Sequence, residues 1–142
     1  MRLKKDSGFT FIETIITITI IVILTAAVGF SAVKFIERAK FAACRNQIES
    51  FRLSLQSYFL DCGMYPTAAQ GLSALWEKPV LAPVPAQWNG PYLDRQLPDD
   101  PWGTAYRYKN PGDKNLPFTI ISYGPDGQEG GDGQNADIYS WE

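Results

Sequence analysis

The feature that most restricts the fold of this 142-residue chain is an uncharged apolar run near its N-terminus. Residues 14–33 contain no charged side chain and are dominated by Ile and Val, and Arg2, Lys4 and Lys5 precede them. A helix of about 20 residues spans roughly 30 Å, the hydrocarbon thickness of a bilayer. Basic residues ahead of such a run favour a cytoplasmic N-terminus. The pattern predicts that residues 9–33 form a helix that crosses a membrane once.

Two alternatives account for this run less well. A secretory signal peptide has a shorter apolar core, followed by a small-x-small cleavage site, whereas here the small residue Gly8 comes before the run. A buried helix of a soluble protein is the second alternative. The membrane interpretation has its own difficulty in Glu13, because an unpaired carboxylate in a bilayer costs on the order of 3 kcal/mol. Glu13 therefore needs a partner.

Composition excludes several classes of function. The chain has no histidine, which removes imidazole bases, Ser-His and Cys-His nucleophile pairs and the usual zinc sites. Its formal net charge of -2 gives no basic surface for nucleic acid. Without a pair of nucleophile and base, a membrane-tethered hydrolase is also disfavoured. We therefore predict a protein that is not an enzyme and does not bind nucleic acid.

A second helical pattern begins at residue 34, where charged side chains return. Apolar or weakly polar residues recur there at alternating spacings of three and four, which is the pattern of one helix face: Phe41, Cys44, Ile48, Phe51, Leu55 and Tyr58. The sequence Gly-Met-Tyr-Pro then ends the helix, which is expected from about Phe9 to Leu60. A straight helix would separate Cys44 from Cys62 by roughly 27 Å, so an intrachain disulfide is not expected. A disulfide between subunits stays open.

The second half of the chain predicts short elements joined by turns, because the glycines and prolines fall almost entirely after residue 60. Residues 105–110 and 118–124 have the patterns of strands in a small antiparallel sheet that would cover the helix stripe. Residues 67–76 predict a short helix capped by Thr67. The proline-rich segment that follows predicts an ordered loop, and LPDDPWG predicts a turn. The expected fold class is α+β, with a long N-terminal helix packed on a small antiparallel sheet.

The N-terminal sequence KKDSGFTFIE resembles the signal of type IV pilin-like proteins. It has a short basic leader, a glycine at the cleavage position, a phenylalanine next and a glutamate four residues later. The resemblance implies that residues 1–8 are a leader, that a prepilin peptidase cuts between Gly8 and Phe9, and that the new amine is methylated. It also gives Glu13 a partner, the N-terminal amine of a neighbouring subunit in a filament. A cationic amine is the natural compensation for a carboxylate in lipid.

The rest of the chain resembles the major pseudopilins of type II secretion systems. The elements GMYPT, QGL, WNGPYL, LPDDPWG, YRY, PG and ADI occur here in that family's order, and the resemblance covers essentially the whole chain. It implies a structural subunit of the periplasmic pseudopilus, the filament that drives folded proteins through an outer-membrane channel. The alternative is a type IV pilin for adhesion, motility or DNA uptake. Such pilins share the N-terminal signal but usually carry a disulfide-closed loop in place of this tail.

The same resemblance implies a location and a set of partners. The precursor would sit in the inner membrane as a single-pass protein, with residues 34–142 forming a periplasmic domain. Its partners would be copies of itself in a helical filament, the prepilin peptidase, the minor pseudopilins and the inner-membrane assembly platform. ATP hydrolysis would belong to a separate motor, since the chain has no phosphate-binding loop.

The C-terminal segment SYGPDGQEGGDGQNADIYSWE predicts a calcium loop. It holds five carboxylates without Lys or Arg, and its glycines leave backbone carbonyls accessible, which suits a cation that prefers oxygen ligands. A flexible solvated loop is the alternative. Against it, Ile138, Tyr139 and Trp141 are expected to anchor the end of the segment. An EF-hand is rejected, because helices do not flank the loop and Asp137 stands where a glutamate is required.

The ligands of this site follow from the pseudopilin resemblance. It implies the side chains of Asp126 and Asp137 and the backbone carbonyl of Tyr123 as calcium ligands. Some relatives carry a second aspartate where this chain has Ala136, and the expected replacement is Asp132 or an oxygen within residues 133–135. The cofactor implied is calcium in a structural role, in which it neutralises clustered carboxylates and orders the loop.

Overall fold

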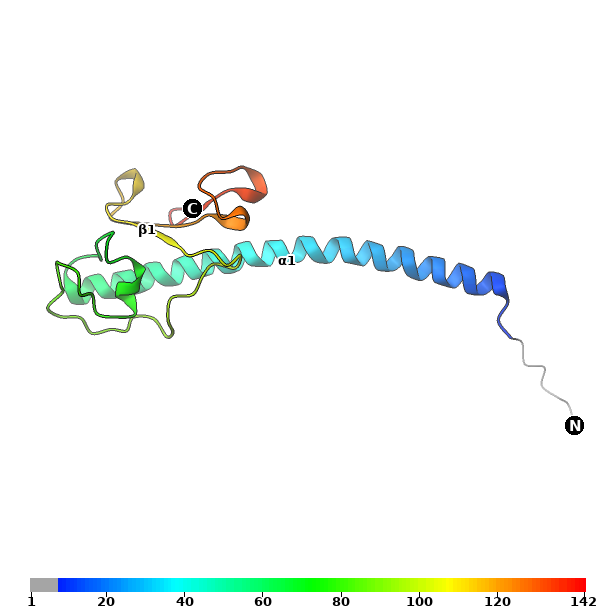
Figure 1. Ribbon diagram of the computed structural model, residues 1–142, viewed down its shortest axis with the longest axis horizontal. Coiled ribbons are helices and arrows are strands. Elements are labelled where there is room, and N and C mark those ends of the chain that lie inside the picture. Colours follow the sequence, from blue (N-terminus) through cyan, green and yellow to red (C-terminus); the bar gives the residue numbers. More distant parts are fainter. Residues whose placement is uncertain (1–7) are drawn as a thin grey trace, which may run out of the picture. The chain divides into compact units, whose positions relative to one another are not determined.

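The structure is a computed structural model that describes residues 8–142, apart from the side chains of residues 27–32 (Figure 1). The leader segment 1–7 lies outside the described residues. The chain divides into two compact units, the first ending at Arg38 and the second spanning Ala39–Glu142. The first holds the beginning of α1 (Phe11–Cys62), and the second holds the end of α1 and the other elements. Each unit is described by itself.

Helix α1 confirms the helix expected from about Phe9 to Leu60. It ends at Cys62 because Gly63 adopts a φ of 73°, a left-handed conformation that glycine takes without a steric penalty. The amide of Gly63 donates to the carbonyl of Phe59 at 2.8 Å and so satisfies one carbonyl of the last turn.

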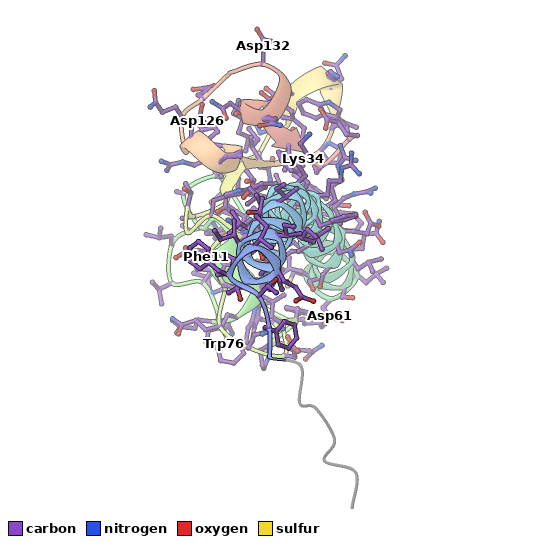
Figure 2. The ribbon with its side chains drawn as sticks, turned by 90° about the vertical axis from the view of Figure 1, so that its right-hand side faces the viewer. Phe11, Lys34, Asp61, Trp76, Asp126 and Asp132 are labelled. Carbon is purple, nitrogen blue, oxygen red and sulfur yellow. The ribbon has the colours of Figure 1, made fainter. Side chains whose placement is uncertain are left out.

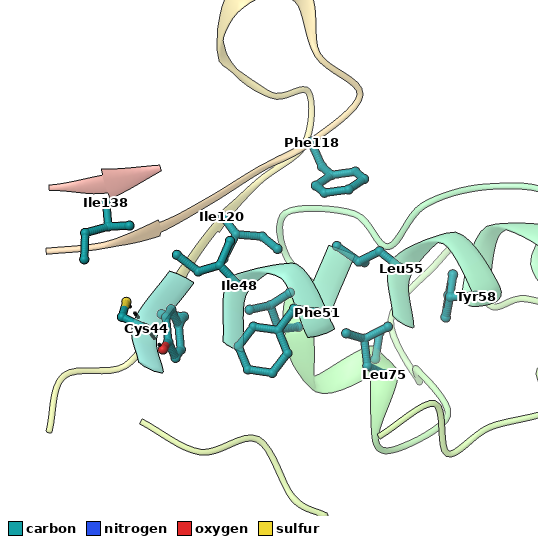
Figure 3. Packing of buried hydrophobic residues seen from close by; sticks show 12 residues of the cluster. Cys44, Ile48, Phe51, Leu55, Tyr58, Leu75, Phe118, Ile120 and Ile138 are labelled. Atoms are coloured by element: carbon teal, nitrogen blue, oxygen red, sulfur yellow. Dashed lines mark hydrogen bonds between the residues drawn. The ribbon is translucent and has the colours of Figure 1, made fainter. Parts of the chain in front are cut away.

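One face of α1 forms the core of the second unit. The predicted stripe is confirmed: Cys44, Ile48, Phe51, Leu55 and Tyr58 are all buried, and Phe41 packs at their edge. Figure 3 shows Ile120, Phe118 and Leu75 lying against this face. Phe51 meets Tyr106 edge to face, with ring centroids 5.1 Å apart. The helix face therefore supplies one side of a single core, and the later elements supply the other.

The sheet is small and antiparallel, as predicted. Its strands are β1 (Arg107–Lys109), β2 (Thr119–Ser122) and β3 (Ile138–Tyr139), in the order β1-β2-β3. Tyr108 of β1 pairs with Ile120 of β2, and Ser122 of β2 pairs with Ile138 of β3. The central strand β2 therefore joins β1 to the C-terminal strand. The pairing of β3 is the anchor expected for the end of the acidic segment. The α+β fold with a long helix on a small sheet is thus confirmed.

Side chains fasten the proline-rich loop to the helix. Trp88 donates from its indole N–H to the carbonyl of Ala74 at 3.0 Å, and the Tyr92 hydroxyl donates to the Asp61 carboxylate at 2.9 Å. The buried Gln70 donates from Nε2 to the carbonyls of Leu81 and Pro83 at 2.7 and 3.0 Å. The bonds from Gln70 satisfy loop carbonyls that belong to no strand or helix, so the loop is ordered as expected.

The short helix expected over residues 67–76 is smaller than predicted. Only the 3-10 helix η1 (Leu72–Leu75) forms, because Gly71 adopts a φ of 62° and interrupts the helical backbone before it. Thr67 caps a turn instead, with its hydroxyl accepting from the amide of Gln70 at 3.2 Å. Leu72 and Leu75 are nevertheless buried, so the apolar residues of the pattern serve the core.

Both cysteines are free, which confirms that they form no intrachain disulfide. Cys44 is fully buried in the helix stripe, and burial raises the pKa of its thiol above the ordinary value. Cys62 is half-buried, and its thiol donates to the carbonyl of Gln87 at 3.3 Å. A disulfide between subunits stays open.

Replacing Leu55 by alanine should lower the free energy of unfolding by about 2–5 kcal/mol, because it leaves a cavity in the core. Leu53 provides a matched control: it lies two residues away on α1 but is 56% exposed, so Leu53→Ala should cost less than about 0.5 kcal/mol. Chemical denaturation of the full chain in detergent measures both changes. Equal losses would contradict the assignment of the buried face.

Candidate functional site

The predicted cleavage residues lie directly ahead of α1. Gly8 and Phe9 precede the first helical residue and are exposed, with Phe9 82% accessible. A Cβ placed on Gly8 would have no heavy atom of the described residues, apart from its chain neighbours, within 4 Å. Both residues of the predicted cleavage position are thus exposed among the described residues.

Glu13 has a partner within its own chain, which the sequence analysis missed. Its Oε2 accepts from the amide of Thr10 at 3.4 Å and from the Thr10 hydroxyl at 3.5 Å, while its own amide donates to that hydroxyl at 3.3 Å. Thr10 and Glu13 thus form a capping box, which satisfies amides that the first helical turn leaves unpaired. The signal was present in the sequence as Thr-x-x-Glu before an apolar run.

Threonine hydroxyl groups in the described part of the apolar run are satisfied by α1 itself. The side chains of Thr17, Thr19 and Thr25 donate to the carbonyls four residues earlier at 2.7, 2.8 and 2.7 Å. The apolar side chains around them are exposed, with Leu24 60% accessible. At these three positions the helix therefore has no unpaired hydroxyl donor, and the side chains exposed around them are apolar.

Among the residues whose side chains are described, no helix is both long enough and apolar enough to cross a membrane. The membrane segment predicted over 9–33 runs across residues 27–32, whose side chains lie outside the described ones, and stays a prediction.

The C-terminal segment folds into a compact loop, here called the acidic loop (residues 123–137). It contains two 3-10 turns, η3 (Gly124–Asp126) and η4 (Gly133–Asn135). Two glycines with positive φ allow its backbone to approach itself: a Cβ on Gly124 would lie 3.1 Å from the carbonyl oxygen of Ala136, and one on Gly131 only 2.4 Å from that of Asn135. The glycines are thus required by close contacts within the loop.

Asp137 is the buried carboxylate of the acidic loop, with an exposed fraction of 7%. Its Oδ2 accepts from the amide of Gly130 at 3.0 Å and from the hydroxyl of Tyr139 at 3.1 Å. Its Oδ1 is buried without a hydrogen-bond partner. Such an oxygen costs free energy unless a cation or another donor reaches it, so this atom fits a calcium ligand. Desolvation and the bond to Asp137 raise the pKa of Tyr139 further above neutral pH, where a tyrosine hydroxyl already keeps its proton and donates.

The other predicted ligands lie farther from the core. Asp126 is exposed at the end of η3, and its Oδ1 accepts from the amide of Gln128 at 3.1 Å. Figure 2 shows Asp132 pointing outward at the edge of the loop, away from Asp126. Tyr123 is half-buried at the start of the loop. Within residues 8–142 no three carboxylate or thiol side chains lie close enough together to hold a metal ion, so the predicted carboxylates are not gathered at one point.

Asp100 is a second buried carboxylate, and the sequence analysis treated it only as part of a turn. The turn is confirmed, since Oδ1 of Asp100 accepts from the amides of Trp102 and Thr104 at 3.0 and 2.8 Å. Its Oδ2 also accepts from the hydroxyl of Ser122 in β2, at 2.6 Å. This long-range bond had no local signal in the sequence. Trp102 in the same turn packs edge to face against Phe41, with ring centroids 4.9 Å apart.

Comparison with known proteins places these features in one family. Residues 32–141 match the family described as Type II secretion system (T2SS), protein G, and residues 3–29 match the Prokaryotic N-terminal methylation motif. The type II secretion system core protein G of Pseudomonas aeruginosa is 39% identical over 142 residues, which cover 100% of this chain and 99% of that protein. Its namesake in Vibrio cholerae is 39% identical over 141 residues, covering 99% and 94% of the two chains.

A solved structure agrees with the sequence relatives. The crystal structure of the major pseudopilin from the type 2 secretion system of enterohaemorrhagic Escherichia coli is similar with a TM-score of 0.66 and 34% identity, and the match covers 77% of this chain and 92% of that one. The type IV pilin alternative is therefore not favoured. With both its N-terminal signal and its C-terminal domain matched, the chain belongs to the type II secretion system protein G family of major pseudopilins.

Proposed function

We propose that copies of this chain polymerise into a periplasmic pseudopilus, which drives folded proteins out of the cell through the type II secretion system. The observation that carries the proposal is the match to core protein G over the whole chain, including the tail that ordinary pilins lack. The role is structural and mechanical. The prepilin peptidase, the minor pseudopilins and an inner-membrane assembly platform are the proposed partners.

Processing would create the subunit that assembles. The peptidase would cut between Gly8 and Phe9 and the new amine would be methylated, a step supported by the methylation motif over residues 3–29. The exposure of both residues ahead of α1 is compatible with access by a protease. The exposed apolar side chains that follow would anchor the precursor in the inner membrane, with residues 34–142 in the periplasm.

Glu13 would exchange its partner during assembly. In the single chain its carboxylate accepts from the amide and the hydroxyl of Thr10 at 3.4 and 3.5 Å, bonds that are exposed and long for a carboxylate. The methylated amine of a neighbouring subunit carries a full positive charge and would compete well for this carboxylate in a medium of low dielectric constant. This pairing would set how far each subunit is offset from the next.

Calcium would complete the acidic loop. The residues that would hold it are Asp137 through its unpartnered Oδ1, Asp126, the carbonyl of Tyr123 and Asp132. When bound, the ion would neutralise these carboxylates and add bonds that order the loop. Asp126 and Asp132 are exposed and do not contribute to the core, so both side chains can turn toward an ion without disturbing it.

Replacing Glu13 by glutamine separates the two roles of this residue. Glutamine at this position still forms a capping box, so α1 should begin unchanged, but the charge that attracts the amine is lost. We expect normal removal of the leader and at least about a tenfold loss of assembled filament, since a charge-assisted bond in lipid is worth roughly 1.4 kcal/mol or more. Mass spectrometry of the N-terminus and electron microscopy of overproduced filaments measure the two effects.

The control for this variant is Glu49→Gln, which removes a carboxylate that is paired with Arg52 on the exposed surface of α1. It should assemble like the parent. Normal filaments from the Glu13→Gln chain would contradict the proposed amine pairing.

Replacing Asp126 by alanine should free the C-terminal tail and leave α1 intact, because the residue is exposed and serves only the acidic loop. In calcium, the parent should resist proteolysis within residues 123–137 and should lose this resistance on chelation. The variant should be cut in both conditions, while its helical circular dichroism stays that of the parent. Asp94→Ala removes another exposed carboxylate and is the control. A tail that stays protected in the Asp126→Ala protein would count against the calcium site.

A further inference from the structure

We propose that Asp100 is the positioning residue of the acidic loop: acting through Ser122 and Gly124, it holds the two ends of this loop in the arrangement that receives calcium. The inference rests on the calcium site proposed above and adds a residue that lies outside the acidic loop. Asp100 precedes the start of this loop by more than twenty residues and touches none of the proposed ligands through its own side chain.

The first step is the rigidity of the turn that carries Asp100. Its carboxylate is only 5% exposed and accepts the amides of Trp102 and Thr104. The backbone closes the same turn, since the amide of Asp100 donates to the carbonyl of Thr104 and that of Gly103 to the carbonyl of Asp100, both at 2.9 Å. Because two amides donate to Oδ1, the carboxylate group cannot rotate freely, and its other oxygen, Oδ2, is held in one orientation.

The second step is Ser122, whose hydroxyl bonds both to Asp100 and to the backbone of the acidic loop. Ser122 is the last residue of β2 and is fully buried. Its hydroxyl donates to Oδ2 of Asp100 at 2.6 Å, and the same oxygen accepts from the amide of Gly124 at 3.2 Å. The hydroxyl has one proton, so donating it to Asp100 leaves the lone pairs of the oxygen for Gly124. The carboxylate thereby orients the hydroxyl as an acceptor for the loop.

The third step is Gly124, where the two ends of the acidic loop meet. Gly124 is buried with a φ of 63°, and its α-carbon is so close to the carbonyl of Ala136 that a Cβ there would lie at 3.1 Å. Tyr123 precedes Gly124 and Asp137 follows Ala136. A shift of Gly124 would therefore change how the Tyr123 carbonyl and the unpartnered oxygen of Asp137 lie relative to each other.

A second contact joins the same turn to the acidic loop. The Thr104 hydroxyl lies where a Cβ on Gly127 would come within 3.1 Å of it. Gly127 directly follows Asp126 and has a φ of 65°. The backbone just after this proposed ligand therefore lies close to Thr104 in the turn. Thr104 is itself held by Asp100 through its amide. The turn at Asp100 thus supports the acidic loop on both sides of η3.

Three variants of the full chain in detergent test this chain of contacts. Ser122→Ala breaks the link to the acidic loop while leaving both amides of the turn bound to Asp100, and Asp100→Asn removes the charge that orients the hydroxyl. Asp99→Asn is the matched control, because Asp99 is the exposed neighbour in the same turn. Calorimetric titration with calcium chloride measures affinity, and melting in a chelator measures the stability of the calcium-free protein.

We expect Ser122→Ala and Asp100→Asn each to weaken calcium binding on the order of tenfold, the worth of one hydrogen bond to a charged group. Asp99→Asn should bind like the parent. In the calcium-free Ser122→Ala protein, hydrogen exchange should also be faster over residues 123–130, since the amide of Gly124 has lost its acceptor.

The outcomes separate the inference from the proposed site. If the parent binds calcium and the two variants bind it as tightly as Asp99→Asn does, Asp100 is only a stabiliser of the fold and the inference is wrong, even if both variants melt earlier. If the parent binds no calcium, the calcium site itself fails and the inference falls with it.

Discussion

The second unit depends on the packing of its later elements against one face of α1. Its strands are three, four and two residues long, and a sheet of this size does not bury a core of its own. Tyr106 and Ile120 become buried because Ile48 and Phe51 present an apolar surface on the helix. Removing that surface would expose both the sheet and the loops fastened around it.

A unit with so little secondary structure satisfies its backbone through side chains. Gln70, Tyr92 and Asp100 each bind backbone groups that have no strand or helix partner, and each lies in a segment that resembles the pseudopilin pattern. These motifs thus contain side chains that satisfy the backbone of the loops around them. Among the described residues, two buried side-chain oxygens have no hydrogen-bond partner, the hydroxyl of Tyr58 and Oδ1 of Asp137. Only the second belongs to a carboxylate, so the acidic loop is where a bound cation would satisfy a buried group.

Much of the fold could be predicted from the sequence because its signals are local. The stripe on α1 follows from a spacing of three and four residues, and the glycine after Cys62 marks the end of the helix. The long-range contacts had no such signal: the bond between Asp100 and Ser122 joins residues 22 positions apart, and the unpartnered oxygen of Asp137 depends on burial. Each predicted ligand is of a type that calcium binds, yet no three carboxylates of the described residues come together at one point. The capping box formed by Thr10 and Glu13 could have been predicted from its Thr-x-x-Glu pattern.

The most direct test of the account is the extracellular proteome of a strain that lacks this chain, compared with its parent and with a strain in which the gene is restored. The account predicts that folded enzymes remain in the periplasm of the deletion strain and return to the medium on restoration. Unchanged export, together with loss of surface fibres or of DNA uptake, would contradict it and would make the chain a pilin in function despite its family.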